Sequence, residues 1–274
     1  MLTLEAPAKI NLGLAVIAKR GDGFHEIDTL MVRLALHDTI RFEPRDRGVT
    51  LRVCGAELGD DRENLAYRAA LLYIRASGVG RGVHLHLTKR IPTASGMGGG
   101  SSDAAAVLRG LAQIYPADID LMALALQLGS DVPFFVLEHR AARARGRGER
   151  LEPIELPNAA LVLANPQVEV MSGFAYEHLQ NFSRRLPVAE IVGRLERNED
   201  PRLFNALQAG VLRKEPRIRP VLEALRSAGL SGVLMSGSGA TCFGLAREET
   251  HAKEVVGILR DRYPSWWVKS TTFG

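Results

Sequence analysis

The chain has 274 residues, of which 46% are hydrophobic and 24% are charged. This apolar share is typical of globular proteins, so a chain that is disordered throughout is excluded, and the length fits one large domain or two of ordinary size. Lysine and arginine together number 35 against 31 for aspartate and glutamate. Such a small excess, without a long block of like charge, allows an anionic ligand but does not indicate nucleic acid.

In the first half of the chain, the spacing of apolar residues predicts strands over residues 3–17, 30–42 and 83–87, the first with a tight bend near Pro7. A helix is predicted after Asn64, a good N-cap, with Gly78 at its end. Further helices are predicted through residues 107–114 and over 120–128. The arginines of residues 140–150 alternate with small residues and predict a strand or hairpin with a solvated face.

After Pro157 the pattern starts again. It predicts strands at 160–164, on both sides of Gly237 and at 266–271, and helices at 173–181, 188–195, 203–213, 218–227 and 248–262. Strands followed by helices in both halves predict an α+β fold with two domains, residues 1–157 and 158–274.

The two cysteines, the N-terminal residues and one long uncharged run indicate in which cellular compartment the protein acts. Cys54 and Cys242 lie far apart in apolar stretches, which favours two buried thiols in a reducing compartment over a disulfide or metal site. Residues 1–11 have no basic n-region, so no signal peptide is predicted. The uncharged run 227–246 is half Gly, Ser or Thr and favours two strands around a glycine loop over a membrane helix. We therefore expect a cytoplasmic protein.

The segment Gly96–Ser102 is the most unusual of the sequence, with four glycines in five positions. Bare backbone lets N–H groups approach an anion, and Ser101 and Ser102 add hydroxyl groups and are expected to cap the helix that follows. The pattern is neither a P-loop nor a dinucleotide fingerprint. A purely structural turn is the alternative, but the flanking strand and helix favour a phosphate site.

Lys9 stands among apolar neighbours, where an ammonium group must find a carboxylate, a phosphate or water. Asn11 lies two residues on and shares its face of the predicted strand. A lysine that snorkels to the surface is the alternative. Two polar groups on one face of an apolar strand indicate a site.

Asp131 precedes the apolar stretch Val132–Phe135, which suits either an N-cap or a base or metal partner. The second glycine loop, Ser236–Ala240, is compatible with either a phosphate contact or a tight hairpin. His84 and His86 alternate with apolar residues. A metal pair is conceivable, but no third ligand is nearby in the sequence, so a solvated strand face is predicted.

Three segments in this order, Pro7-Ala-Lys-Ile-Asn11, Pro92 to Ala105 and Ser236-Gly-Ser-Gly239, resemble the GHMP kinase superfamily (galacto-, homoserine, mevalonate and phosphomevalonate kinases). Gly21-Asp-Gly-Phe-His25, Gly129-Ser-Asp-Val-Pro133 and Gly146-x-Gly-Glu149 resemble the branch whose acceptor carries a cytidine diphosphate. The resemblance covers nearly the whole chain.

The resemblance implies two α+β domains with the active site in the cleft between them. It implies transfer of the γ-phosphoryl group of ATP, with Mg²⁺, to the 2-hydroxyl of a methylerythritol linked to cytidine diphosphate, in the non-mevalonate route to isoprenoid precursors. The expected partner is that small molecule, with no nucleic acid or membrane partner, and the expected state is a monomer or weak homodimer.

The resemblance also assigns roles. Lys9 and Asp131 match the catalytic pair, in which the aspartate accepts the proton of the attacking hydroxyl and the lysine holds it ionised. The triphosphate loop comprises Pro92, Thr93, Ala94, Ser95, Gly96, Met97, Gly98, Gly99, Gly100, Ser101 and Ser102, and Asn64 falls at the adenine contact. The acceptor side comprises Asn11, Phe24, His25, Asp131, Ser172, Tyr176, Gly237 and Ser238. No metal ligand is assigned.

The sequence departs from the family pattern at Phe24, and three alternative functions stay open. Phe24 stands where relatives often have tyrosine, so a ring can stack on cytosine but a hydroxyl contact is lost. Tyr176 is expected to supply the opposing ring. The alternatives are another GHMP kinase of the mevalonate or homoserine type, an RNA-binding module that uses Arg140–Arg150, and a serine hydrolase, for which no Gly-x-Ser-x-Gly elbow is present.

Overall fold

The computed structural model describes residues 1–57 and 59–274. Within it the chain forms two compact units: one comprises residues 1–8, 36–93 and 98–139, and the other comprises residues 9–35, 94–97 and 140–274. The long strands β1 (Leu2–Lys19) and β2 (His25–Arg45) run through both units, so the units alternate along the chain. The pair of consecutive domains that meet near Pro157 stays a prediction.

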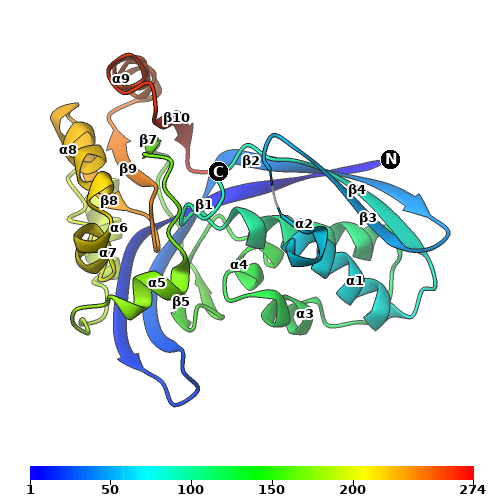
Figure 1. The fold of residues 1–274 in the computed structure, drawn as a ribbon. Coiled ribbons are helices and arrows are strands. Elements are labelled where there is room, and N and C mark those ends of the chain that lie inside the picture. Colours follow the sequence, from blue (N-terminus) through cyan, green and yellow to red (C-terminus); the bar gives the residue numbers. More distant parts are fainter. Residues whose placement is uncertain (58) are drawn as a thin grey trace. The chain divides into compact units, whose positions relative to one another are not determined.

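The first unit is a small sheet with helices. Within it the end of β2 pairs antiparallel with β4 (Gly82–Thr88), and β4 pairs parallel with β3 (Val49–Cys54). The helical elements are η1 (Asp61–Glu63), α1 (Leu65–Ser77), α2 (Gly99–Ile114), α3 (Leu121–Leu128) and α4 (Val132–Val136). In Figure 1, α1 and α2 lie along one face of these strands.

Side-chain alternation decides which face of this sheet is covered. Val83, Leu85 and Leu87 on β4 are buried, whereas His84 and His86 on the opposite face are only half-buried. Phe42 on β2 is also buried, and it packs beside Gly110, where α2 has no side chain to hold the helix away. The helices therefore press close to the strands that carry the apolar residues.

The second unit holds a four-stranded sheet in the order β10-β7-β9-β8 with antiparallel pairing throughout, and a hairpin β5–β6 that pairs with the start of β2. The strands are β5 (Ala141–Gly146), β6 (Arg150–Pro153), β7 (Ala160–Asn165), β8 (Ser231–Met235), β9 (Cys242–Ala246) and β10 (Trp267–Thr272). The helices are α5 (Ser172–Glu177), α6 (Val188–Glu196), α7 (Gln208–Lys214), η2 (Pro216–Ile218), α8 (Arg219–Ser227) and α9 (Glu249–Arg262).

Amphipathic helices complete the core of the second unit. Val221 and Leu225 of α8 and Val255 and Leu259 of α9 join one cluster with Val162 at the centre of β7. Each helical pair is four residues apart and therefore faces one side of its helix. This cluster stabilises the sheet whose turn between β8 and β9 carries the second glycine loop.

Most predicted elements are confirmed within a few residues, but several details differ. β1 is one continuous strand through Pro7. β3 was not predicted, although Val49, Leu51 and Val53 alternate with Thr50 and Arg52 as in a half-buried strand. Cys54, at the end of β3, is exposed rather than buried, whereas Cys242 is buried as expected and burial raises the pKa of its thiol.

Helix α7 begins at Gln208 rather than near residue 203. The backbone before it pairs with β1 instead, because Leu14 N–H donates to Phe204 O at 2.8 Å and Ala206 N–H donates to Leu14 O at 2.8 Å. These bonds use backbone groups that a longer helix would need. A contact distant in sequence therefore overrides local helix propensity.

Among the described residues, no helix combines the length and the apolar character that crossing a membrane requires.

The packing of Gly110 gives a test of the first unit. A Cβ at this position would lie 2.7 Å from Phe42 Cε1, so Gly110→Ala should lower the free energy of unfolding by about 1–3 kcal/mol through overpacking. Gly257→Ala in α9 is the matched control, because nothing lies within 4 Å of its Cβ, and it should be neutral or stabilising by about 0.5–1 kcal/mol. Urea unfolding measures both, and equal effects would contradict the packing described.

Candidate active site

Lys9 and Asn11 are buried side by side on β1. They are 4% and 3% exposed, and Lys9 Nζ donates to Asn11 Oδ1 at 2.6 Å. Asn11 Nδ2 donates in turn to Thr29 Oγ1 on β2 at 2.8 Å. The shared strand face is confirmed, and the alternative of a lysine that snorkels to the surface is excluded. A buried ammonium group at this position suits an anionic ligand.

The two glycine loops meet beside this pair. Ser236 Oγ donates to Gly96 O at 3.0 Å, and Thr241 N–H donates to Ser95 O at 3.2 Å. A Cβ on Gly237 would lie 3.4 Å from Lys9 Nζ. Bare backbone therefore lines the space next to the ammonium group, so the phosphate-contact interpretation of the second loop gains support alongside its role as a turn.

Gly96 is required where it stands. Its φ of +75° is in the left-handed region, and a Cβ would collide with the carbonyl oxygen of Ser236 and lie 2.9 Å from Gly239 N. Only glycine combines this backbone conformation with so close an approach between two loops.

Asn205 supports the second loop and was not assigned any role from the sequence. It is buried, and its Nδ2 donates to both Met235 O and Gly237 O at 2.8 Å, while its Oδ1 accepts from Leu207 N–H at 2.9 Å. Its partners lie 30 and 32 residues away, so local spacing gave no signal for it.

The start of α2 corrects one prediction. The helix begins at Gly99 with Gly98 as its N-cap at φ +68°, and no side chain forms a capping hydrogen bond in the part of the chain that the structure describes. Ser101 and Ser102 lie inside the first turn, so the expectation that they cap the helix was wrong. The first N–H groups of α2 are left for an anion rather than used by a side chain.

Ser102 fits a phosphate–metal group. It is 1% exposed, and its Oγ has no hydrogen-bond partner among the described residues. A buried hydroxyl without a protein partner is costly unless a ligand or water completes it. Together with the N-terminus of α2, this hydroxyl is a suitable ligand for a metal ion bound to phosphates.

A buried ion cluster, which sequence analysis did not find, anchors the glycine segment. Lys89 Nζ donates to Asp103 Oδ2 at 2.7 Å and also to Asp38, and Asp38 Oδ1 accepts from Arg90 N–H and, at 2.9 Å, from Ile91 N–H. Burial raises the pKa of Asp103 to about 7, with Asp38 adding to the shift and Lys89 opposing it. Asp103 is therefore the carboxyl of this cluster that holds a proton in mildly acidic solution.

Asp131 occupies the N-cap position of α4, yet its carboxylate makes no capping hydrogen bond. Asp120 at the start of α3 does cap, with Oδ1 accepting from Met122 N–H at 2.8 Å and Ala123 N–H at 3.2 Å. Asp120 therefore caps its helix with its side chain, whereas Asp131 does not, and the interpretation of Asp131 as an N-cap loses its support.

Asn64 is confirmed as the N-cap of α1, because its Oδ1 accepts from Ala66 N–H at 2.9 Å. Gly78 ends the helix in the left-handed conformation, as predicted. A contact of Asn64 with a nucleotide base would use the Nδ2 donors, since the oxygen serves the cap.

Four of the predicted acceptor residues meet in pairs in the second unit. The rings of His25 and Tyr176 stack with centroids 4.8 Å apart and an angle of 19° between planes. Ser172, on the same helix as Tyr176, lies with its Oγ 3.4 Å from Ser238 Oγ. Burial lowers the pKa of His25, and Lys19 lowers it further, so the imidazole is neutral at pH 7.

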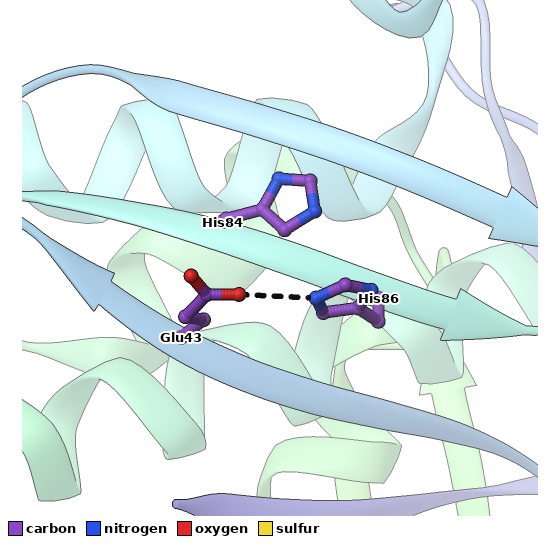
Figure 2. A group of neighbouring side chains, drawn as sticks. All are labelled: Glu43, His84 and His86. Carbon is purple, nitrogen blue, oxygen red and sulfur yellow. Dashed lines mark hydrogen bonds and ion pairs between the residues drawn. The ribbon is translucent and has the colours of Figure 1, made fainter.

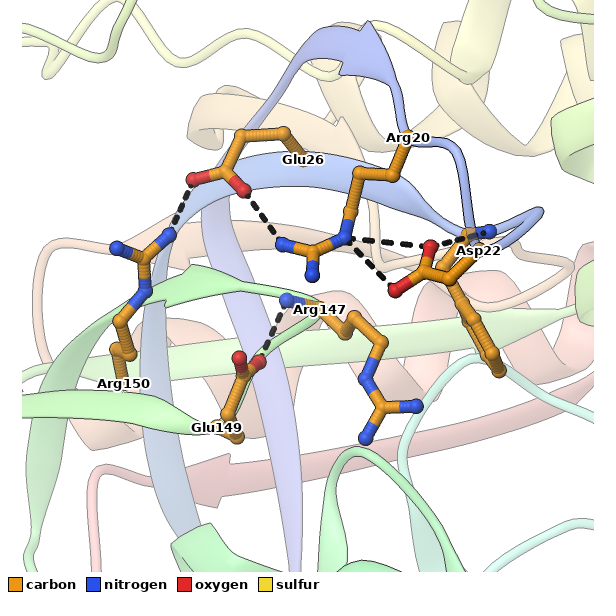
Figure 3. Close-up of polar contacts among 7 residues, drawn as sticks. Arg20, Asp22, Glu26, Arg147, Glu149 and Arg150 are labelled. Atoms are coloured by element: carbon orange, nitrogen blue, oxygen red, sulfur yellow. Dashed lines mark hydrogen bonds and ion pairs between the residues drawn. The ribbon is translucent and has the colours of Figure 1, made fainter.

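Ion pairs hold the turn that carries Phe24 and His25 (Figure 3). Arg20 bridges Asp22 at 3.1 Å and Glu26 at 3.0 Å, and Arg150 reaches Glu26 at 2.6 Å. The Arg147 guanidinium lies 4.6 Å from the centre of the exposed Phe24 ring.

The remaining arginines of the predicted hairpin are also used within the protein. Arg143 makes two hydrogen bonds to the buried Asp28, at 2.7 and 2.8 Å, and Arg145 pairs with Glu152 at 3.1 Å. Arg143 and Arg145 therefore each have a carboxylate partner within the protein.

Comparisons with known proteins agree with this geometry. The model of the GHMP kinases N terminal domain matches residues 64–139, and that of the GHMP kinases C terminal region matches residues 184–265. A relative from Deinococcus radiodurans named 4-diphosphocytidyl-2-C-methyl-D-erythritol kinase is 51% identical over 96% of this chain and 90% of its own. This chain belongs to the GHMP kinase family. It is an ATP-dependent small-molecule kinase.

Further relatives of this kinase agree. A protein of the same name from Thermus thermophilus is 46% identical over 95% of this chain and 94% of its own. A crystal structure of 4-(cytidine 5'-diphospho)-2C-methyl-D-erythritol kinase covers both chains completely with 44% identity and a TM-score of 0.90. A mevalonate kinase from L. major, at 16% identity and a TM-score of 0.71, shares the fold. The predicted α+β GHMP-kinase fold is confirmed.

The kinase's glycine loops provide a test. Gly96→Ala should lower kcat/KM by about 100-fold, because the added Cβ displaces backbone that lies beside Lys9. Gly78→Ala also places alanine at positive φ, but nothing lies within 4 Å of its Cβ, so it should cost only about 1–2 kcal/mol of stability and leave turnover unchanged. Steady-state kinetics below the Tm of each variant measures kcat/KM for Gly96→Ala and Gly78→Ala. A kcat/KM near that of wild type for Gly96→Ala would contradict the role of the loop contact.

The buried ion cluster predicts a pH effect on stability. Folded protein holds the Asp103 proton up to about pH 7, whereas the unfolded chain releases it near the ordinary value of 3.8. Wild type should therefore lose stability relative to Asp103→Asn, which is neutral at every pH, by on the order of 2–4 kcal/mol as pH rises from 4 to 7. Urea unfolding at several pH values measures this difference, and a difference that does not change with pH refutes the assignment.

Proposed function

We propose that this kinase transfers the γ-phosphoryl group of ATP to the 2-hydroxyl of 4-diphosphocytidyl-2-C-methyl-D-erythritol, a step of the non-mevalonate route to isoprenoid precursors. The names of relatives at 38–51% identity over nearly the full chain support this acceptor. The observation that carries the chemistry is the buried Lys9 ammonium group beside the bare backbone of two glycine loops. Phosphoryl transfer depends on such positioning and charge neutralisation more than on covalent chemistry.

Asp131 is proposed as the base that accepts the proton of the attacking hydroxyl. It stands at the start of α4 within Gly129-Ser-Asp-Val-Pro133, a segment that resembles the branch of the family whose acceptor carries a cytidine diphosphate. Lys9 is proposed to place positive charge where the reacting oxygens gather, with Asn11 fixing the direction of its ammonium group.

The nucleotide is proposed to lie along the glycine segment, residues 92–102, with Asn64 contacting adenine. N–H groups at the start of α2 and the backbone of Gly96 suit the phosphate oxygens. Mg²⁺, when bound, neutralises phosphate charge, and the buried Ser102 hydroxyl is the residue that would hold it.

The acceptor is proposed to be bound by the aromatic residues and small polar groups of the second unit. His25, Tyr176 and Phe24 offer ring faces for cytosine, and the neutral imidazole of His25 can accept or donate a hydrogen bond to the base. Asn11, Ser172, Gly237 and Ser238 are proposed to contact the rest of the acceptor. We expect the enzyme to act in the cytoplasm as a monomer or weak homodimer, with neither nucleic acid nor membrane as a partner.

A coupled ADP-release assay over a panel of acceptors tests the substrate. The panel contains 4-diphosphocytidyl-2-C-methyl-D-erythritol, mevalonate and homoserine. We expect turnover with the cytidine diphosphate compound and only background rates with the others. Turnover with mevalonate or homoserine instead would establish a different kinase of this family.

Asp131→Ala tests the base. Its removal should lower kcat by about 10²–10⁴-fold, the usual contribution of a positioned general base, with the protein still folded. Asp120→Ala is the matched control, because it removes a true cap at a cost of about 1 kcal/mol in stability and should leave kcat unchanged. Near wild-type kcat in folded Asp131→Ala would falsify the assignment.

A further inference from the structure

The outer face of the first unit's sheet brings three metal-ligating side chains together (Figure 2). His84 and His86 lie on β4, and Glu43 stands directly opposite His84 on β2. One potential ligand atom from each of the three lies within 4.8 Å of the others. The sequence prediction of a plain solvated face rested on the absence of a third ligand, and strand pairing supplies that ligand from 41 positions away (84 − 43).

We propose that Glu43, His84 and His86 form a binding site for one divalent transition metal ion of the Zn²⁺ type. Two imidazoles and one carboxylate are a donor set that Zn²⁺ uses with a fourth position left to water. The site lies on the sheet face opposite to the buried residues of β4, and none of its three residues is assigned above to catalysis or binding.

The observed distances suit that ion. His86 Nε2 and Glu43 Oε2 are 3.3 Å apart. Two ligands at Zn–N and Zn–O bond lengths of about 2.0–2.1 Å lie roughly 3.3–3.4 Å apart in a tetrahedron. The His84 and His86 rings meet edge to face, with centroids 4.3 Å apart and an interplanar angle of 89°. The ligand atom of His84 lies within 4.8 Å of the other two, so it must approach them for all three to bind one ion.

Neighbouring groups orient the ligands. Thr50 Oγ1 on β3 lies 2.6 Å from His84 Nδ1, which leaves Nε2 on the side of His86 (Figure 2). Arg45 pairs with Glu43 Oε1 at 3.2 Å and leaves Oε2 for the ion. Hydrogen bonds of this kind to the far side of a ligand fix its direction and strengthen metal binding.

An ion at this site ties β2 to β4. Both strands carry apolar residues on the opposite face that pack under α1 and α2, so the ion stabilises the sheet rather than taking part in phosphoryl transfer. Stabilisation follows because a ligand that binds only the folded state shifts the unfolding equilibrium.

Metal titration tests the proposal. Chelator-treated full-length protein without nucleotide is titrated with Co²⁺, whose visible absorption becomes intense in tetrahedral sites, and with Zn²⁺ by calorimetry. We expect saturable binding of one ion per chain and a rise in Tm with metal. His86→Gln and Glu43→Gln should each weaken binding by roughly tenfold or more.

His37→Gln is the matched control. His37 also lies on β2 and faces a carboxylate, with Nε2 3.5 Å from Glu5 Oε1, but it is not part of the three-ligand cluster. The metal affinity of His37→Gln should equal that of wild type. The kcat of His37→Gln, His86→Gln and Glu43→Gln should be unchanged. Absence of saturable binding in wild type, or equal binding by wild type, His86→Gln and Glu43→Gln, would overturn the proposal, and either result leaves the kinase assignment untouched.

Discussion

A lysine buried between two carboxylates is the constraint on which the glycine segment depends. Lys89 stands just before that segment and bonds to Asp38 on β2 and to Asp103 in α2, just after it. Asp38 also holds the backbone of Arg90 and Ile91. A buried cation without partners would cost several kcal/mol, so these groups must meet for the unit to fold, and their meeting fixes both ends of the segment. A loop that would otherwise be flexible is thereby held ready for phosphates.

The middle of the same segment is fixed by backbone rather than by charge. Residues 94–97 belong to the second unit, where Gly96 contacts the loop at Ser236 and where Lys9 N–H donates to Met97 O at 3.0 Å. Glycine is needed because carbonyl groups of two loops approach each other closely. The two buried lysines thus differ in their surroundings: Lys89 lies between the carboxyl groups of Asp38 and Asp103, and Lys9, beside the two glycine loops, is proposed to serve the reaction.

Local signals in the sequence predicted a good part of this arrangement. Asn64 predicted the start of a helix, and the spacing of Lys9 and Asn11 predicted that they share one face of a strand. Both predictions are confirmed. Features that depend on distant pairing were not predictable: Asp38 finds Lys89 51 positions away, and Asn205 finds Gly237 32 positions away. The prediction that Ser101 and Ser102 cap α2 failed because Gly98, at positive φ, starts the helix earlier. The catalytic and binding roles themselves stay predictions, supported by these contacts.

Single-turnover phosphoryl transfer by Lys9→Met, with Lys89→Met as its counterpart, tests the division between the two lysines most directly. The account predicts that Lys9→Met folds, with a stability loss of about 1–3 kcal/mol from the unsatisfied Asn11 oxygen, and transfers the phosphoryl group at least about 100-fold more slowly. Lys89→Met should unfold far more readily, because the buried carboxyl groups of Asp38 and Asp103 both lose their cationic partner. A folded Lys9→Met that transfers phosphoryl groups at the wild-type rate contradicts the account.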